Sequence, residues 1–229
     1  MVKDSHIVSE REEAPRTHCI RCGTCCMKGG PTLHEDDATL FAEGVLEKIH
    51  VYTLRKGEVI RNIDDSLMIL EGEMIKIKGE GETWLCMLYD DNEKACKIYQ
   101  DRPAECRALK CWDPRDLIEV MATPRLQRTN LINQDDGILK IIEAHEQRCA
   151  YETLEAAVMG LQQPGSDKAV EKILDLLQYD QYIRPFLTEK LNVDPNAMDF
   201  FFGRPLATTI RRFGLCVKEE GGGFTLVPA

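Results

Sequence analysis

The sequence predicts an α+β protein in which a small cysteine-rich domain with short strands and one helix precedes a mostly α-helical region. Three observations lead to this prediction. Eight of the ten cysteines lie before residue 117, and β-branched residues alternate with Gly and Asp turns between residues 50 and 90. After residue 118, apolar residues recur at three-to-four spacing. We therefore expect a flexible tail at 1–16, a metal-binding domain at 17–117 and a helical region at 118–229.

The first domain should contain a helix from about Glu35 to Ile49. Its apolar residues recur at helical spacing, and its acidic first turn complements the helix dipole. The following runs, "VYTLRKGEVI" and "SLMILEGEMIKIKGEGETWLCML", are typical of a small meander of short strands separated by glycine turns.

The second region is predicted to be helical over "DGILKIIEAHEQRCAYETLEAAVMGLQQ" and "SDKAVEKILDLLQYDQYIRPFLTEKL". Pro164-Gly165 separates the two runs, and Ser166 or Asp167 is a suitable N-cap for the second. The chain should end in a short hairpin, with strands at Phe213–Val217 and Phe224–Val227 around a glycine-rich turn.

Composition narrows the classes of function. A formal net charge of −10 without a useful basic stripe argues against nucleic acid as the main partner. The start of the chain has no apolar leader, and no stretch has the ~18 consecutive apolar residues of a membrane span. We therefore expect a cytoplasmic protein without a membrane partner. Thiols stay reduced there, so clustered cysteines indicate metal binding or catalysis in preference to disulfides.

The first cysteine group lies in "CIRCGTCC". Cys19, Cys22 and Cys25 have the spacing C-x2-C-x2-C, which lets a looping backbone wrap thiolates around one metal centre. Gly23 offers the positive φ that a tight ligand loop needs. Adjacent side chains of an extended chain point to opposite sides, so we expect Cys25 and Cys26 to serve different metal positions.

The second group supplies further thiols in "CMLYDDNEKACKIYQDRPAECRALKC". Pro103 suits the first turn of a short helix that presents Cys106, and this helix must end before Cys111 if both are to reach one site. Cys149 and Cys216 lie in apolar patterns and are interpreted as packing residues. The predicted metal ligands are Cys19, Cys22, Cys25, Cys26, Cys86, Cys96, Cys106 and Cys111.

Thiolate-only ligation suits zinc and iron–sulfur clusters. The second group lacks the close-spaced C-x2-C pair of structural zinc sites, and three close cysteines with a remote fourth are common in cubane-cluster proteins. We therefore predict one or two iron–sulfur clusters of the 4Fe–4S type, with zinc as the alternative.

At these motifs the sequence resembles the bacterial and archaeal YkgJ-like family of cysteine-cluster proteins, described as chelators of zinc or iron. The resemblance covers residues 17 to 112. "CIRCGTCC" matches the first family motif, and Cys86 and Cys111 fit as further cysteines around the second. The matching residues of the second motif, within "CKIYQDRPAECR", are Cys96, Tyr99, Arg102, Pro103, Cys106 and Arg107.

Two arginines of the second motif are candidate cofactor-binding residues. A centre with four thiolates is anionic, so Arg102 and Arg107 could offset its charge and donate N–H bonds to sulfur. The alternative is surface pairing with Asp101 and Glu105. His18 is either a ligand or, more simply, a solvated loop histidine, and His34 is expected to help start the first helix.

Three classes of function remain open from the sequence. The first is an iron–sulfur protein with a redox or accessory role, with an unknown protein partner. The second is a zinc-chelating or metal-delivery protein. Flagellin lysine methylases carry a similar cysteine signature, which implies a protein-modifying enzyme as the third. However, the chain has no G-x-G-x-x-G fingerprint, and the candidate groups form no recognisable catalytic set: His18, His34, Asp36, Asp37 and Tyr99.

Overall fold

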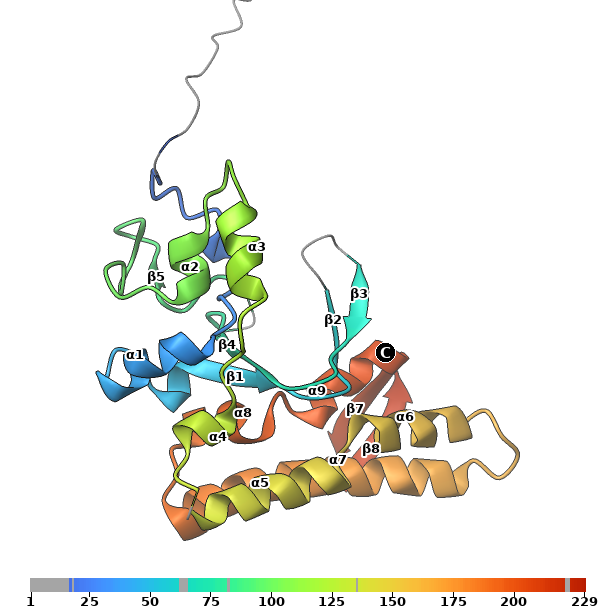
Figure 1. Ribbon diagram of the computed structural model, residues 1–229. Coiled ribbons are helices and arrows are strands. Elements are labelled where there is room, and N and C mark those ends of the chain that lie inside the picture. Colours follow the sequence, from blue (N-terminus) through green and yellow to red (C-terminus); the bar gives the residue numbers. More distant parts are fainter. Residues whose placement is uncertain (1–16, 18, 62–65, 82, 135, 221–222) are drawn as a thin grey trace, which may run out of the picture.

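The computed structural model describes residues 17, 19–61, 66–81, 83–134, 136–220 and 223–229. The predicted tail at 1–16 and His18 lie outside these residues. The order of elements confirms the α+β class, with short paired strands in the first half and helices in the second (Figure 1).

The predicted helix over Glu35–Ile49 is wrong in its extent. A 3-10 turn, η2 (Glu35–Asp37), leads into α1 (Ala38–Ala42), and the chain then reverses at Gly44, whose φ is +73°. After the reversal, the backbone N–H of Leu46 donates to Leu40 O at 3.0 Å. The apolar residues that suggested one long helix therefore reach the same core through a turn. A second 3-10 turn, η3 (Lys48–His50), precedes the strands.

The strands form one long hairpin and not a meander. The outer pair is β1 (Val51–Leu54) with β4 (Met74–Ile77), and the inner pair is β2 (Val59–Arg61) with β3 (Leu67–Ile69), both antiparallel. Between the two pairs, Leu70 N donates to Glu58 O at 2.9 Å, so the outer and inner pairs continue in one residue register. The chain thus reverses direction once, between β2 and β3, and this hairpin projects from the body of the molecule (Figure 1).

The cysteine-rich stretch after the hairpin has little regular structure. It contains the two-residue strands β5 (Tyr89–Asp90) and β6 (Ala95–Cys96) and the short helices α2 (Ala104–Ala108) and α3 (Arg115–Met121).

The predicted helical region and terminal hairpin are confirmed in kind. The first predicted run is interrupted between Arg148 and Tyr151 and forms two helices, and the first hairpin strand begins at Leu215 and continues to Glu220. The long helix α7 (Asp167–Leu191) begins after Ser166, as expected, and its buried face packs on α6 and the terminal hairpin. The other elements are α4 (Arg128–Leu131), α5 (Gly137–Arg148), α6 (Tyr151–Gly160), α8 (Met198–Phe202), α9 (Leu206–Thr209), β7 (Leu215–Glu220), β8 (Gly223–Pro228) and the 3-10 turns η4 (Pro195–Ala197) and η5 (Ile210–Phe213).

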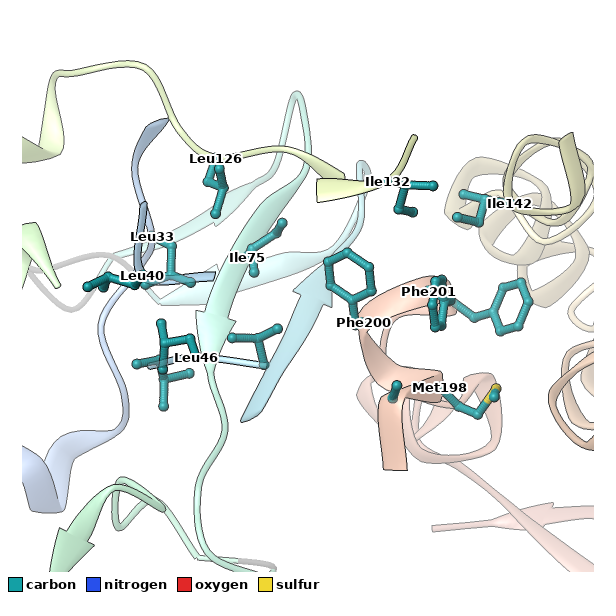
Figure 2. Close-up of a cluster of buried hydrophobic side chains, with 14 of the residues drawn as sticks. Leu33, Leu40, Leu46, Ile75, Leu126, Ile132, Ile142, Met198, Phe200 and Phe201 are labelled. Atoms are coloured by element: carbon teal, nitrogen blue, oxygen red, sulfur yellow. The ribbon is translucent and has the colours of Figure 1, made fainter. Parts of the chain in front are cut away.

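The largest apolar core draws on both halves of the chain. Figure 2 shows Leu33 and Ile75 from the first half on one side, with Phe200 and Phe201 of α8 facing them from the second. Thr53 Oγ1 also donates to Phe200 O at 2.7 Å, which fixes β1 against α8. A domain boundary near residue 117 stays a prediction, but the hydrophobic packing crosses it. Within the described part of the chain, no helix has the length and apolar character needed to cross a membrane.

Candidate metal centre

The eight cysteines predicted as ligands line one cavity of 330 Å³. They come from the loop at 19–26, the segment before β5, strand β6, helix α2 and the turn after α2. Cys149 instead lies fully buried in the apolar cluster beneath α6 and α7, and Cys216 lies in β7 opposite Val227. The fold therefore separates the eight from the two cysteines interpreted as packing residues, while ligation itself remains a prediction.

The first loop is shaped by a glycine that sits against an aromatic ring. Gly23 has a φ of +74°, as expected, and accepts a hydrogen bond from Met27 N at 3.0 Å. A Cβ atom at this position would lie 2.4 Å from Tyr89 Oη. Glycine is required here both for its backbone conformation and for its lack of a side chain.

The expectation that Cys25 and Cys26 point to opposite sides is wrong. Cys25 has helical backbone angles and precedes the 3-10 turn η1 (Cys26–Lys28), so its side chain does not follow the alternation of an extended chain. The two Sγ atoms lie 4.0 Å apart. Ligands on one tetrahedral zinc ion, with Zn–S of ~2.3 Å, stand about 3.8 Å apart. The pair can therefore serve the same metal position.

Backbone hydrogen bonds hold the second cysteine group against the first. Cys86 N donates to Cys26 O at 2.8 Å, which joins the loop to the segment before β5. Tyr89 then pairs with Cys96 across β5 and β6. The predicted short helix is confirmed as α2, which follows Pro103, carries Cys106 and ends at Ala108, before Cys111.

Two acidic side chains fix helix α2. Asp37 is buried, and its carboxylate accepts from Ala104 N at 2.8 Å and from His34 N at 2.9 Å. Glu105 accepts from Thr32 N at 2.7 Å and lies 3.4 Å from His34 Nε2. His34 stands at the N-cap of η2, so it does help to start the first helical segment as expected. These contacts connect the start of the first helical segment to the helix that carries Cys106.

The pKa values of the cavity thiols are shifted in different directions. The hydrogen bond with the Cys26 side chain lowers the pKa of Cys25 to about 6, and the charge of Arg102 acts in the same direction. The same hydrogen bond raises the pKa of Cys26. Burial raises the pKa of both Cys86 and Cys106. Metal binding at these thiols must displace protons.

The two motif arginines differ in position. Arg102 lines the cavity, donates from Nε to Tyr99 O at 2.8 Å, and stacks on the Tyr99 ring at 3.8 Å from its centroid. Arg107 is exposed and donates to Arg102 O, and it does not line the cavity. Within the described residues, neither makes the ion pair with Asp101 or Glu105 that was the alternative interpretation.

Sequence reasoning missed several residues that shape the site. Arg21 stacks on the same Tyr99 ring, at 4.1 Å from the centroid, and so clamps the first loop to the second motif. The roles of Tyr89, Asp37 and Glu105 depend on contacts between segments more than 60 residues apart. Spacing within the sequence carries no signal for such contacts.

Comparison with known proteins supports metal binding. A family model described as "CxxCxxCC: Putative zinc- or iron-chelating domain" matches residues 18–150, more than half of the chain. The chain belongs to this family. It is also 32% identical over 90 residues to the uncharacterized protein MJ0661 of Methanocaldococcus jannaschii, a match covering 39% of this chain and 42% of that protein. No solved structure matches the chain. The YkgJ-like resemblance is thereby confirmed, and the matched segment contains all eight cysteines that line the cavity.

Proposed function

We propose that this protein holds an iron–sulfur cluster in the cysteine-lined cavity and serves a redox or accessory role. The observation that carries the proposal is the arrangement of the sulfur donors. Eight cysteines surround a volume of 330 Å³, and among the described residues no three His, Cys, Asp or Glu side chains converge closely enough to hold a single ion. Bridging sulfide fills the space between ligands in an iron–sulfur cluster, so its ligands stand further apart than those of one zinc ion.

The donor set fits such a cluster chemically. All eight candidate ligands are thiols, and thiolates are the ligands that iron–sulfur clusters prefer. A bound cluster would accept and release single electrons. The Arg102 guanidinium on the cavity wall offsets the negative charge of the thiolates and favours ionised Cys25.

Zinc chelation is the second candidate, because one specific observation favours it. The Cys25 and Cys26 sulfur atoms lie 4.0 Å apart, which is close to the distance of about 3.8 Å between two sulfur ligands of a tetrahedral zinc ion. A zinc-binding protein of this kind would serve in metal storage or delivery.

Elemental analysis distinguishes the two. The protein should be purified without oxygen and assayed for iron, acid-labile sulfide and zinc. We expect iron and sulfide in equal amounts, with a brown protein. Stoichiometric zinc in a colourless anaerobic preparation without iron would contradict the iron–sulfur proposal and support the zinc one.

A further inference from the structure

The mouth of the cysteine-lined cavity carries positive charge on an acidic protein. Arg21, Lys28, Lys94 and Arg102 line it, whereas Glu105 is the one carboxylate among the described lining residues. The whole chain has a net charge of −10. Glu105 is mostly buried and is turned inward to Thr32 N and His34. The charge of the exposed lining residues is therefore opposite in sign to that of the whole chain.

Among the described residues, three of these four cations enter no ion pair, and only Lys94 has a carboxylate partner. In the body of the molecule, some arginines pair closely with acids, for example Arg128 with Glu73 at 2.7 Å and Arg204 with Glu58 at 2.7 Å. At the mouth, Lys94 pairs with Asp91 at 2.7 Å. Within the described part of the chain, the guanidinium of Arg21 stacks on Tyr99 and enters no ion pair, and Lys28 is exposed without one.

Large apolar side chains surround the same mouth. They lie at or beside cavity-lining positions, so their exposed surface is gathered around the cavity. Trp84 packs near Gly29, and Trp112 follows Cys111. The exposed fractions are 53% for Ile20, 54% for Met27, 69% for Trp84 and 38% for Trp112.

Unpaired cations around exposed aromatic and aliphatic side chains form the pattern of a protein docking surface. Tryptophan and arginine are enriched at such interfaces, and complementary charge speeds the encounter and fixes the orientation of the partner. A small anion would need the charge alone and would leave Trp84 and Met27 without a role. The acidic turn that follows Tyr89 does not line the cavity, and its Asp90 and Asp91 already accept hydrogen bonds within the turn.

We propose that an acidic protein docks over the mouth of the cavity, contacting Lys28 and Arg21 with carboxylates and Trp84 with an apolar centre. This inference rests on the proposed function in one respect, which is that the acidic protein is an electron carrier. Docking at this face places the carrier beside Cys19, Cys22 and Cys111, which are exposed cysteines of the cavity.

Binding of an acidic [2Fe–2S] ferredoxin to the anaerobically purified full chain tests the proposal. Calorimetry at low and high ionic strength should show binding that weakens with salt, because exposed charges are screened within about 10 Å at 0.1 M. Lys28→Glu should weaken binding roughly three- to tenfold, and Trp84→Ser roughly tenfold. Lys140→Glu is the matched control, since Lys140 is exposed on α5 at the opposite end of the molecule (Figure 1).

Metal content is measured on every variant, so that docking and metal identity are judged separately. Equal affinity of wild type, Lys28→Glu and Lys140→Glu, or absence of salt-dependent binding, would overturn the docking proposal. Loss of binding in Lys28→Glu with unchanged metal content supports it. A zinc-loaded protein that still binds through Lys28 would support the docking surface while overturning the iron–sulfur proposal.

Discussion

At the scale of single residues, the Cys25–Cys26 pair offers the most direct test of the predicted ligand set. Their sulfur atoms lie 4.0 Å apart, a separation that lets both bind one metal centre. We expect Cys25→Ser and Cys26→Ser each to lower the metal content of the purified protein by at least half, since a hydroxyl is a poor ligand for soft metals. Elemental analysis per protein chain gives the result directly.

The two remaining cysteines supply the control for that experiment. Cys149→Ser and Cys216→Ser should leave metal content unchanged, because these residues pack away from the cavity. Cys149→Ser should cost stability alone, since Cys149 is fully buried. Loss of metal from a folded Cys149 or Cys216 variant would show that the ligand set has been assigned wrongly.

Protonation of the cavity thiols predicts a strong pH dependence of metal binding. The pKa values of Cys26, Cys86 and Cys106 are raised, so these thiols hold protons at neutral pH and must release them to a metal. Affinity should therefore rise with pH, about tenfold per pH unit for each proton released. Cys25, with a pKa of about 6, adds little above pH 7.

Competition between the reduced, metal-free protein and a chelator for Zn²⁺ at pH 6.5, 7.5 and 8.5 measures this dependence. An affinity that stays constant over that range, after correction for the chelator, would mean that the metal binds thiols that are already ionised.

At the scale of elements, the site depends on how α2 is held. Asp37 accepts from Ala104 N at the start of α2 and from His34 N at the start of η2. Asp37→Ala leaves both donors without this partner and should lower the free energy of unfolding by about 1–2 kcal/mol. It should also weaken metal retention, because Cys106 lies on α2.

Chemical denaturation and metal release to a chelator measure these two effects. Asp36→Ala is the matched control, since the neighbouring Asp36 is exposed and its side chain is not needed by α2. Equal metal release from the two variants would show that α2 is positioned by other contacts.

The sequence predicts an element correctly where a pattern of neighbouring residues alone determines it. Helices α5, α6 and α7 follow from apolar spacing, and α2 follows from Pro103. The prediction of one helix over Glu35–Ile49 was wrong because the chain reverses at Gly44. The same apolar residues then reach the core from both sides of this turn. The side chains of Cys25 and Cys26 were expected to point to opposite sides, and this failed because it assumed an extended backbone where the chain is helical. Whether the two bind different metal positions stays a prediction. The contact of Gly23 with Tyr89 is tertiary and left no local pattern.

At the scale of the whole molecule, the cysteine-rich segment and the helical half share one core. Cys86, Leu88 and Tyr89 belong to the same apolar cluster as Phe200 and Leu187. Arg128 of α4 donates to Glu73 beside β4, to Glu146 of α5 and to Phe201 O of α8. The hairpin is thus fastened to the helices by buried polar contacts as well as by apolar packing.

This shared core predicts a graded response to metal removal. The segments 19–31 and 83–117 have short elements and line the cavity, so they should gain much of their folding free energy from the metal. The apolar cluster beneath α6, α7 and α9 contains no cavity-lining residue, whereas the hairpin core shares its cluster with Cys86 and Leu88. Anaerobic chelation should therefore increase hydrogen exchange first in the cavity segments and leave α7 protected. Because Cys86 and Leu88 also pack in the core, the melting temperature of the whole chain should fall as well. Unchanged exchange in 19–31 and 83–117 after complete metal removal would mean that the cavity is formed without its metal, whereas simultaneous loss of protection in α7 would mean that the metal and both halves fold as one unit.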